Sequence, residues 1–475
     1  MKNVTRRNIL MKRFTAVMMI MLLCSLMVFT AACSPLNSDE EAAIKKDVYD
    51  IYDVLRTSWK EADDIDGIKE PVREWAEDNG ISCTDIDEGS MMLNLDATDR
   101  FTDAKGTIIS CSIGLDDTKQ KSQCAAIALS AVKNCSEHGN IRVLFTAVDD
   151  KGRYGAEGLD KKYLSMDNFI SIGYWPKTKL FTGSASSTEF TFKRNIQSKT
   201  PEGNTAYKVE ISDLEGGDSS DRSRKHPNPI ITLGELLNSL NQNDLVFELA
   251  DFNGGSSSGD YAKDASMTIV IDDNYAKKFE ERVNAKITSF EESYIEKESD
   301  LSFTCAPCKM PEKVYSDDDL TNIISLFYTI EDGKIEDEEE SDDSQAIANV
   351  GLAKDNGKTL TIKAKARALS SEQISALATS YESTAKLAQF KLTSEDTYPG
   401  WPFKESSDLI DRYVLATNQV ELDLEPEWTL SENECAVFYS KKPEMDMIGI
   451  GANIENGPEI AESLVLCLRS LGGES

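Results

Sequence analysis

The sequence predicts an α/β domain with a mostly parallel core sheet, interrupted by an inserted α+β domain of lid type. Three observations predict this fold class. An apolar run at 141–148 is typical of a strand buried on both faces of a parallel sheet. Strands alternate with helices on both sides of this run, which indicates βαβ units. The pattern changes at about residue 188 and returns after the sequence TYPGW at 397–401.

The apolar run at 141–148 ends in two adjacent carboxylates, Asp149 and Asp150. Ligands of open α/β sheets bind beyond the carboxyl ends of the strands, and glycines at 152, 155 and 158 allow a tight turn there. The pair is either a place for chemistry or a solvated turn. The choice between these two interpretations depends on whether the other residues that such a site needs are present.

Residues 1–32 have the pattern of a secretion signal, with a basic start followed by a long apolar run. Small residues stand directly before Cys33, which resembles a bacterial lipoprotein signal in which Cys33 receives lipid and becomes the mature amino terminus. Residues 33–43 then form a tether. An uncleaved membrane anchor is the alternative, and it leaves the body on the same face. We therefore expect the protein on the outer face of the bacterial cytoplasmic membrane, held there by lipid.

The first domain is predicted at 44–187 and 396–475. Ile44 to Trp59 have helical spacing, and Pro71 is predicted to open a second helix that Gly80 ends. The elements that follow are strands at 91–95 and 107–113, a helix around 125–132, the central strand, and a strand at 168–173. After TYPGW we expect a helix at 409–416, a strand at 445–451 and a last helix at 459–471.

The inserted domain is predicted at 188–395. Its strands are EFTFKR, AYKVEISDL, LVFELADF and SMTIVID, with helices at 230–240 and 274–298. Asp355-Asn356-Gly357 predicts a hairpin before TLTIKAKARAL, and Ser370 or Ser371 begins a helix that ends near Ala388. The acidic run at 331–343 is interpreted as a solvated loop.

The charge of the chain limits the classes of molecule that it can bind. The formal net charge is −32, and removal of the basic signal makes it more negative. This charge excludes nucleic acid as a partner and opposes contact with anionic lipid heads, so the lipid must hold the protein at the membrane. Peptides or cationic partners fit the charge. The sequence does not predict an oligomeric state.

The chain has ten cysteines, and most of those in the body, such as Cys111, Cys124 and Cys467, fall in buried patterns. Cys305-Ala-Pro-Cys308 is the exception. Outside the cytoplasm a CxxC forms a disulfide, a redox pair or half of a zinc site, and no second CxxC completes four thiolates. We favour a disulfide-forming or incidental pair.

Several stretches resemble the aminoacyl-histidine dipeptidases, the cytosol non-specific dipeptidases of the di-zinc exopeptidase clan. They are HGNIRVLFTAVDDKGRYGAEGL, DLEGGDSS, DFNGGSSSG, TYPGW, the Glu434-Cys435 pair and KKPEMDMIGIG. The resemblance extends from about residue 66 to the end, in the same order and with similar spacing. It implies a zinc-peptidase α/β domain interrupted by a smaller lid domain.

The same resemblance implies that the di-zinc chemistry is lost. The family's metal-binding positions correspond here to Ser112, Gly114, Lys119, Gly173 and Pro458, or to Glu459 if the gap is moved. Asp149 matches the general-base glutamate and Asp150 a metal-binding glutamate, each one methylene shorter. Asp218 stands in Gly-Gly-Asp-Ser where the family has a histidine for the oxyanion, and a carboxylate has the wrong charge for that role.

The residue count leads to the same expectation without the family. The chain has two histidines, His138 and His226, so no histidine-rich zinc cluster can form, and we expect both to be structural. A carboxylate-only magnesium or calcium site is an alternative. We predict no cofactor and a non-catalytic protein that binds a ligand or partner. The alternative is a zinc-dependent dipeptidase or related hydrolase with a rebuilt site.

Overall fold

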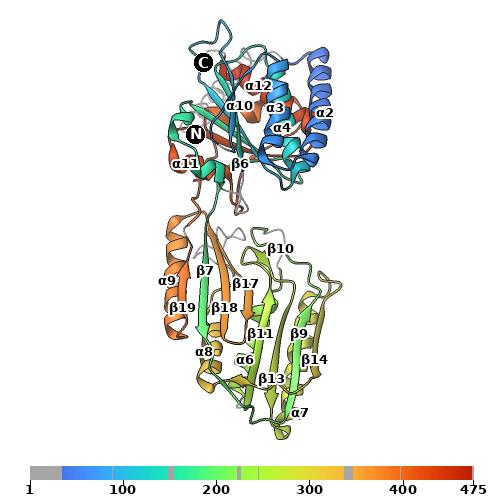
Figure 1. Ribbon diagram of the computed structural model, residues 1–475, viewed down its shortest axis with the longest axis vertical. Helices are drawn as coiled ribbons and strands as arrows, with labels where there is room; N and C mark the ends of the chain where they lie inside the picture. Colours follow the sequence, from blue (N-terminus) through green and yellow to red (C-terminus); the bar gives the residue numbers. More distant parts are fainter. Residues whose placement is uncertain are drawn as a thin grey trace, which may run out of the picture. The chain divides into compact units, whose positions relative to one another are not determined.

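The computed structural model describes residues 35–87, 89–147, 154–221, 226–243, 245–335, 346–395 and 397–472 (Figure 1). The chain divides into two compact units. The first comprises residues up to Thr182, Lys404–Glu427 and the chain from Val437, and the second comprises Gly183–Phe403 and Trp428–Ala436. The second unit therefore begins and ends outside the predicted limits of 188–395, and it includes a short return segment that the sequence pattern did not indicate.

The first unit contains an eight-stranded mixed sheet in the order β1-β2-β4-β3-β5-β21-β6-β20. Its middle strands β4, β3, β5 and β21 are parallel neighbours, as predicted, and antiparallel strands flank them. The strand bounds are β1 Ser82–Asp85, β2 Met91–Leu95, β3 Thr107–Ile113, β4 Ile141–Ala147, β5 Asn168–Tyr174, β6 Lys179–Ser184, β20 Pro426–Thr429 and β21 Asp446–Ala452.

Helices cover both faces of this sheet. On one face the apolar sides of α2, α3, α4, α10 and α12 form a single core with the strands, and this core includes the fully buried Trp59 and Tyr413. On the other face Phe438 of α11 packs on Phe169 of β5, with 4.5 Å between the ring centroids. The helix bounds are α2 Ser38–Glu61, α3 Ile65–Asp78, α4 Thr118–Asn134, α5 Tyr154–Gly158, the 3₁₀ turn η1 Lys161–Leu164, α10 Asp408–Gln419, α11 Glu434–Lys441 and α12 Gly457–Gly472.

Two helix starts differ from the sequence prediction. Helix α2 begins at Ser38, inside the predicted tether 33–43, because Asn37 and Glu40 form a capping box. Helix α3 begins at Ile65 rather than at Pro71, because the Asp64 carboxylate accepts a hydrogen bond from the Gly67 backbone. Proline lacks a backbone N–H, so Pro71 inside α3 gives up one intrahelical hydrogen bond.

The second unit is built on a nine-stranded sheet in the order β14-β9-β13-β11-β17-β18-β7-β19, with β16 paired to β17. All its strand pairs are antiparallel. The bounds are β7 Ser186–Asn195, β9 Thr205–Ser212, β11 Phe247–Gly255, β13 Ala265–Ile271, β14 Ser302–Pro307, β16 Gly333–Lys334, β17 Ala346–Asp355, β18 Thr359–Ala368 and β19 Lys391–Ser394. Two small ladders join β8 Ser198–Lys199 to β15 Val314–Tyr315 and β10 Gly217–Asp218 to β12 Asp260–Tyr261.

Helices α6 Pro229–Gln242, α7 Asp273–Tyr294, α8 Asp317–Thr329 and α9 Ser371–Leu387 share one core with this sheet and lie on its far side in Figure 1. Along β18, core residues such as Ile362 and Ala364 alternate with Lys363 and Lys365, which are only partly buried. Helices therefore cover one face of the sheet, while the other face carries polar side chains. Helix α8 was not predicted.

Candidate functional site

The parallel strands bring their carboxyl ends to one edge of the first sheet. Thr146 of β4 lies opposite Ser112 of β3, and Gly173 of β5 lies opposite Gly451 of β21. This edge is where an open α/β sheet places its ligand site. Asp149 and Asp150 follow β4 in the sequence but lie outside the described residues.

The positions that the family resemblance singled out flank this edge. Ser112 lies within β3 and is followed closely by the buried Gly114, while Gly173 lies at the exposed end of β5. Lys119 is exposed in the first turn of α4, and Pro458 is buried in the first turn of α12. The structure thus places the predicted positions around the predicted edge.

These residues do not fit a pair of zinc ions. Zinc takes three or four donors, chiefly thiolate, imidazole or carboxylate. Gly114, Gly173 and Pro458 carry no donor side chain, and the ammonium of Lys119 repels a cation. Within the residue ranges that the structure describes, no group of three or more His, Cys, Asp or Glu side chains is placed to hold a metal ion.

Glu459, the other candidate for the last ligand, lies next to further acids. One of its carboxylate oxygens is buried without a hydrogen-bond partner. Burial is the largest cause that raises the pKa of Glu462 to about 7, and the negative charges of Glu41 and Glu459 also contribute. Glu462 therefore lies near carboxylates of both α2 and α12, one of which is Glu459.

The two histidines have different surroundings. His138 is 6% exposed, and its Nδ1 lies 2.7 Å from the Gly139 carbonyl oxygen. His226 stacks on Tyr261 with 4.1 Å between ring centroids, and its Nε2 lies 4.0 Å from an Asp221 carboxylate oxygen.

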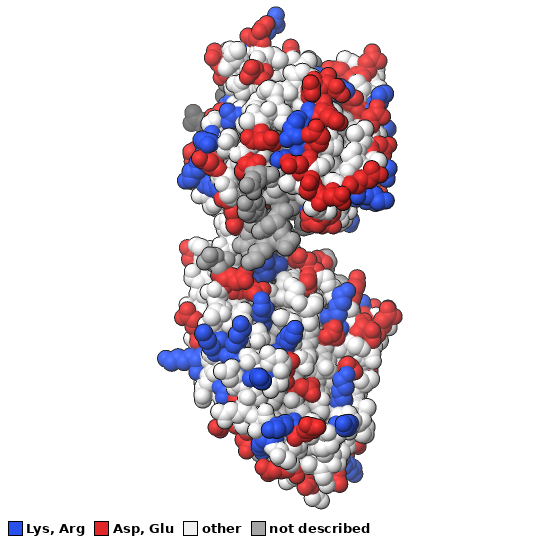
Figure 2. Space-filling model, in the orientation of Figure 1, with Lys and Arg blue, Asp and Glu red and all other residues white. Residues whose placement is uncertain are grey.

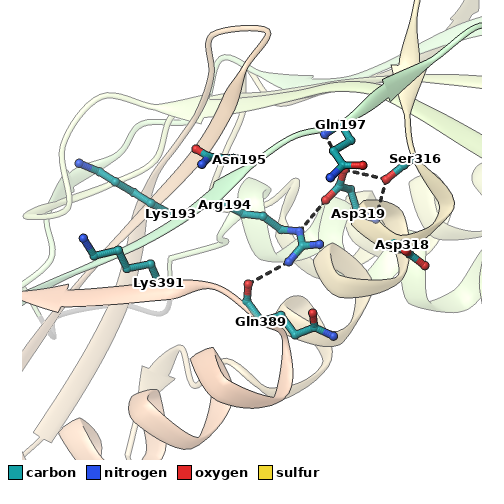
Figure 3. Close-up of a pocket in the computed structure, with 9 residues that line it drawn as sticks. All are labelled: Lys193, Arg194, Asn195, Gln197, Ser316, Asp318, Asp319, Gln389 and Lys391. Carbon is teal, nitrogen blue, oxygen red and sulfur yellow. Dashed lines mark hydrogen bonds and ion pairs between the residues drawn. The ribbon is translucent and has the colours of Figure 1, made fainter.

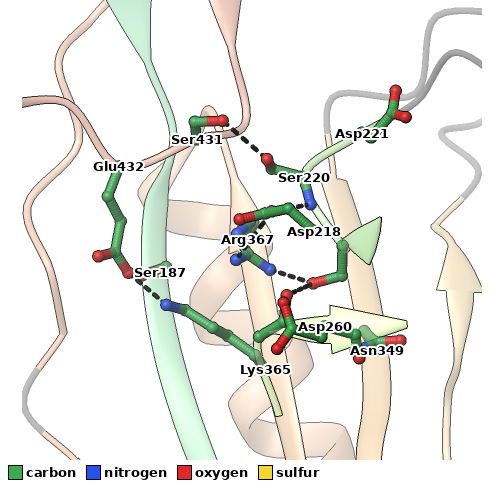
Figure 4. Close-up of polar contacts among 12 residues, drawn as sticks. Ser187, Asp218, Ser220, Asp221, Asp260, Asn349, Lys365, Arg367, Ser431 and Glu432 are labelled. Atoms are coloured by element: carbon green, nitrogen blue, oxygen red, sulfur yellow. Dashed lines mark hydrogen bonds and ion pairs between the residues drawn. The ribbon is translucent and has the colours of Figure 1, made fainter. Parts of the chain in front are cut away.

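A cluster of charged and hydroxyl side chains lies in the second unit, where the sequence indicated Asp218 (Figure 4). Asp218 of β10 stands directly opposite Asp260 of β12, and both side chains are exposed. Arg367 of β18 is 3% exposed, donates a hydrogen bond to the Ser219 hydroxyl, and holds its Nη2 3.6 Å from Asp218. Burial lowers the pKa of Arg367. Its Nε is buried without a hydrogen-bond partner.

The same cluster contains a second ion pair, between Lys365 and Glu432. The Ser187 hydroxyl also donates to Glu432, at 2.6 Å. Burial alone would raise the pKa of Glu432, but the Lys365 ammonium and these hydrogen bonds hold it below its ordinary value. Sequence reasoning missed both Arg367 and Lys365. The alternation Lys363, Lys365, Arg367 along one strand was the signal that could have found them.

Cys305 and Cys308, for which the sequence left a disulfide-forming or an incidental pair open, are both free thiols in the structure. Cys305 lies in β14 opposite Val209, and the Cys308 backbone continues the pairing by donating to the Ala206 carbonyl. Residues three apart on an extended chain face opposite sides of a sheet, which separates the two sulfur atoms. Burial raises the pKa of Cys305 to about 11, which disfavours a redox role.

Cys33 lies outside the described residues. Across the part of the chain that the structure covers, no helix combines the length and the apolar character that crossing a membrane requires.

The fold identifies the structural class of the protein. A doubly covered mixed sheet with a parallel centre, interrupted by a second α+β unit, is a metallo-dipeptidase-like fold. Over 375 residues the chain is 24% identical to the cytosol non-specific dipeptidase of Escherichia coli strain K12, covering 76% of this chain and 74% of that protein. The crystal structure of aminoacylhistidine dipeptidase from Vibrio alginolyticus superposes with a TM-score of 0.75 at 19% identity, covering 89% of this chain and 96% of that one. No protein-family model matches the chain.

These similarities confirm the predicted fold class and the resemblance to dipeptidases. The chain has a dipeptidase-like α/β fold with an inserted α+β unit.

Proposed function

We propose that the chain is a lipid-anchored extracytoplasmic binding protein with a dipeptidase-like fold and no catalytic metal centre. The supporting observation is the set of residues at the carboxyl edge of the parallel strands, where Gly114, Gly173 and Lys119 occupy positions that need metal donors. Without a bound metal there is no activated water and no Lewis acid for peptide hydrolysis.

The competing proposal is a metal-dependent dipeptidase with a rebuilt site. Its support is the sequence similarity to the Escherichia coli dipeptidase. Such a site would have to draw on carboxylates, beginning with Asp149 and Asp150, and carboxylate oxygens suit magnesium or calcium better than zinc. Metal content and dipeptide turnover separate the two proposals.

We expect the protein, purified without chelator, to contain no stoichiometric zinc and to leave dipeptides uncleaved when zinc, manganese or cobalt is added. Asp149→Glu should restore no activity, because the longer carboxylate has no metal-bound water to act on. Elemental analysis and a dipeptide cleavage assay provide the measurements. One equivalent of zinc, or turnover that Asp150→Ala abolishes, would establish the hydrolase instead.

The second unit is best suited to bind a ligand that has a positively charged end. Asp218 and Asp260 are directly opposed on paired strands, and like charges so placed repel each other. The buried Arg367 compensates Asp218 from one side only, and the exposed carboxylates remain open to a further cation. The amino terminus of a peptide supplies such a charge. We therefore propose peptides as the ligand class, held by the amino end.

The test is calorimetric titration of a dipeptide beside its N-acetylated form, which lacks the cationic end. Asp218→Asn and Asp260→Asn should each weaken binding of the free dipeptide by about tenfold or more, because a hydrogen bond to a charged group contributes about 1.5–3 kcal/mol. Asp300→Asn, at an exposed aspartate of the same unit, serves as the matched control. Equal affinity for the acetylated peptide would contradict an amino-end site, while leaving the metal result untouched.

A further inference from the structure

A cavity of about 1150 Å³ lies among the helices of the second unit, where α6, α7 and the end of α8 meet. Cavities of roughly this size are typical of small-molecule sites. Its lining contains neither Asp218 nor Asp260, so it is separate from the cluster in Figure 4.

Aromatic side chains form much of the apolar part of this lining. Phe290 and Tyr294 lie one turn apart on α7, with 5.0 Å between their ring centroids. Tyr328, at the end of α8, also lines the cavity and is 70% exposed. Aromatic rings attract apolar groups over their whole surface and cations over their faces.

The lining also contains Asp332, which follows α8 and carries an uncompensated charge. Its Oδ1 accepts from the Asn228 side-chain amide at 2.9 Å and from the Val350 backbone at 2.7 Å. Within the residue ranges that the structure describes, Oδ2 accepts no hydrogen bond and Asp332 belongs to no ion pair. Burial raises the pKa of Asp332 to about 7, and the negative charge of Glu235 adds to this effect.

Side chains from different elements of the lining face the same space as Asp332. Burial is the largest cause that raises the pKa of Tyr294 on α7 and of Tyr261 on β12, and the charge of Asp332 contributes to both. The charge of Glu235 on α6 also raises the pKa of Tyr294. Electrostatic effects weaken with distance, so these groups are neighbours across the cavity.

A second buried carboxylate of this unit shows how such a charge is compensated. Asp319 lines a smaller cavity of about 330 Å³, drawn in Figure 3. It accepts a hydrogen bond from Arg194 Nε at 2.7 Å, and it also accepts from the Gln197 backbone and the Ser316 hydroxyl. The chain thus supplies a cation to Asp319, whereas among the described residues it supplies none to Asp332.

The two faces of the second sheet differ in charge. Figure 2 shows lysine and arginine side chains gathered on the face where Figure 1 shows β7 and β18. The cavity lies among the helices that cover the other face. Of the two lysines in its lining, Lys286 is paired with Glu235 at 2.6 Å and Lys334 is exposed. A cation therefore meets less repulsion in the cavity than on the open face.

We propose that this cavity binds an organic amine, with the ammonium group held by Asp332 and the apolar body lying against Phe290 and Tyr294. The ammonium supplies the charge that Asp332 lacks and can donate a hydrogen bond to Oδ2. The aromatic rings add attraction for the cation and for the apolar body. This inference is independent of the peptide site proposed at Asp218.

The first measurement is calorimetric titration of the full-length chain, purified in uncharged detergent, with phenethylamine at about pH 8. This pH lies above the pKa of Asp332 and below that of a primary amine, so both groups are charged. Phenethyl alcohol has the same ring and chain length without the charge, and it should bind at least about tenfold more weakly. Equal affinity for the alcohol would contradict an amine site.

The variants test the two parts of the site. Asp332→Asn should weaken binding of the amine at least about tenfold. Asparagine keeps an oxygen that can accept from Asn228 and Val350, so this variant removes the charge and preserves both bonds. Ser239→Trp should weaken binding as well, because the indole fills part of the cavity from a partly exposed position on α6. Asp300→Asn, at an exposed aspartate, is the matched control.

The second measurement is the unfolding midpoint. Phenethylamine should raise the wild-type midpoint and leave that of Asp332→Asn nearly unchanged, because a ligand stabilises only the native state that binds it. Without the amine, Asp332→Asn should have the higher midpoint, because it removes an uncompensated buried charge. The proposal is overturned if wild-type protein does not bind the amine, or if Asp300→Asn weakens binding as much as Asp332→Asn. It is also overturned if Asp218→Asn abolishes binding, which would place the amine at the other acidic site.

Discussion

Replacing Arg194 by leucine is expected to lower the free energy of unfolding by about 3–5 kcal/mol, the usual cost of removing one partner from a buried ion pair. Asp319 is 1% exposed, and its charge would remain buried with only the Gln197 and Ser316 hydrogen bonds to compensate it. The loss includes the bond from Arg194 to the Gln389 carbonyl. Urea unfolding followed by circular dichroism measures the change.

Two controls test this explanation. The double variant Arg194→Leu, Asp319→Leu should recover a large part of the loss, because no buried charge remains uncompensated. Lys277→Leu, which breaks an exposed pair with Glu281, should change the free energy of unfolding by no more than about 0.5 kcal/mol. A cost below about 1 kcal/mol for Arg194→Leu would mean that water solvates Asp319 in the variant and that the pair is not a buried one.

The sequence predicted the first sheet well because its signals are local. A strand that is buried on both faces is apolar along its whole length, so its own residues identify it. The apolar run of β4, with strands and helices alternating around it, is such a signal. The inserted unit was also visible, since strands with alternating burial, such as β18, differ in period from the buried strands of the first unit.

Helix boundaries were predicted less well, since capping decides them. The Asp64 cap starts α3 before Pro71, and the Asn37 and Glu40 capping box starts α2 inside the expected tether. The unpredicted α8 carried a usable signal: Ser316 is followed by three aspartates in the first helical turn, which is typical of a helix start.

The functional-site residues also divide into those that the sequence could place and those that it could not. The edge that carries Ser112 and Gly173 follows from strand order, so the sequence could place it. The pair Asp218–Asp260 depends on the register between strands far apart in the chain. No local pattern specifies that register, because it is set by packing across the whole sheet. Only the three-dimensional structure reveals these opposed charges.

Membrane attachment is expected to depend on Cys33 alone. Residues 1–32 combine a basic start with an apolar run, and small residues precede Cys33, as in a lipoprotein signal. The rest of the chain is strongly acidic, and anionic lipid heads repel it. Acyl chains gain about 0.8 kcal/mol for each buried CH₂ group, so the lipid supplies the membrane affinity that the acidic body lacks.

Cys33→Ser should therefore lose all acyl label, and the protein should be released in soluble form or retain an uncleaved signal. Metabolic labelling with a fatty acid, followed by separation of membrane and soluble fractions, measures both effects. Cys308→Ser is the matched control, because it removes an exposed thiol from the second unit and should leave label and membrane association unchanged. Wild-type protein that is soluble and unlabelled would exclude the lipoprotein assignment. Label that persists in Cys33→Ser would place the lipid on another residue.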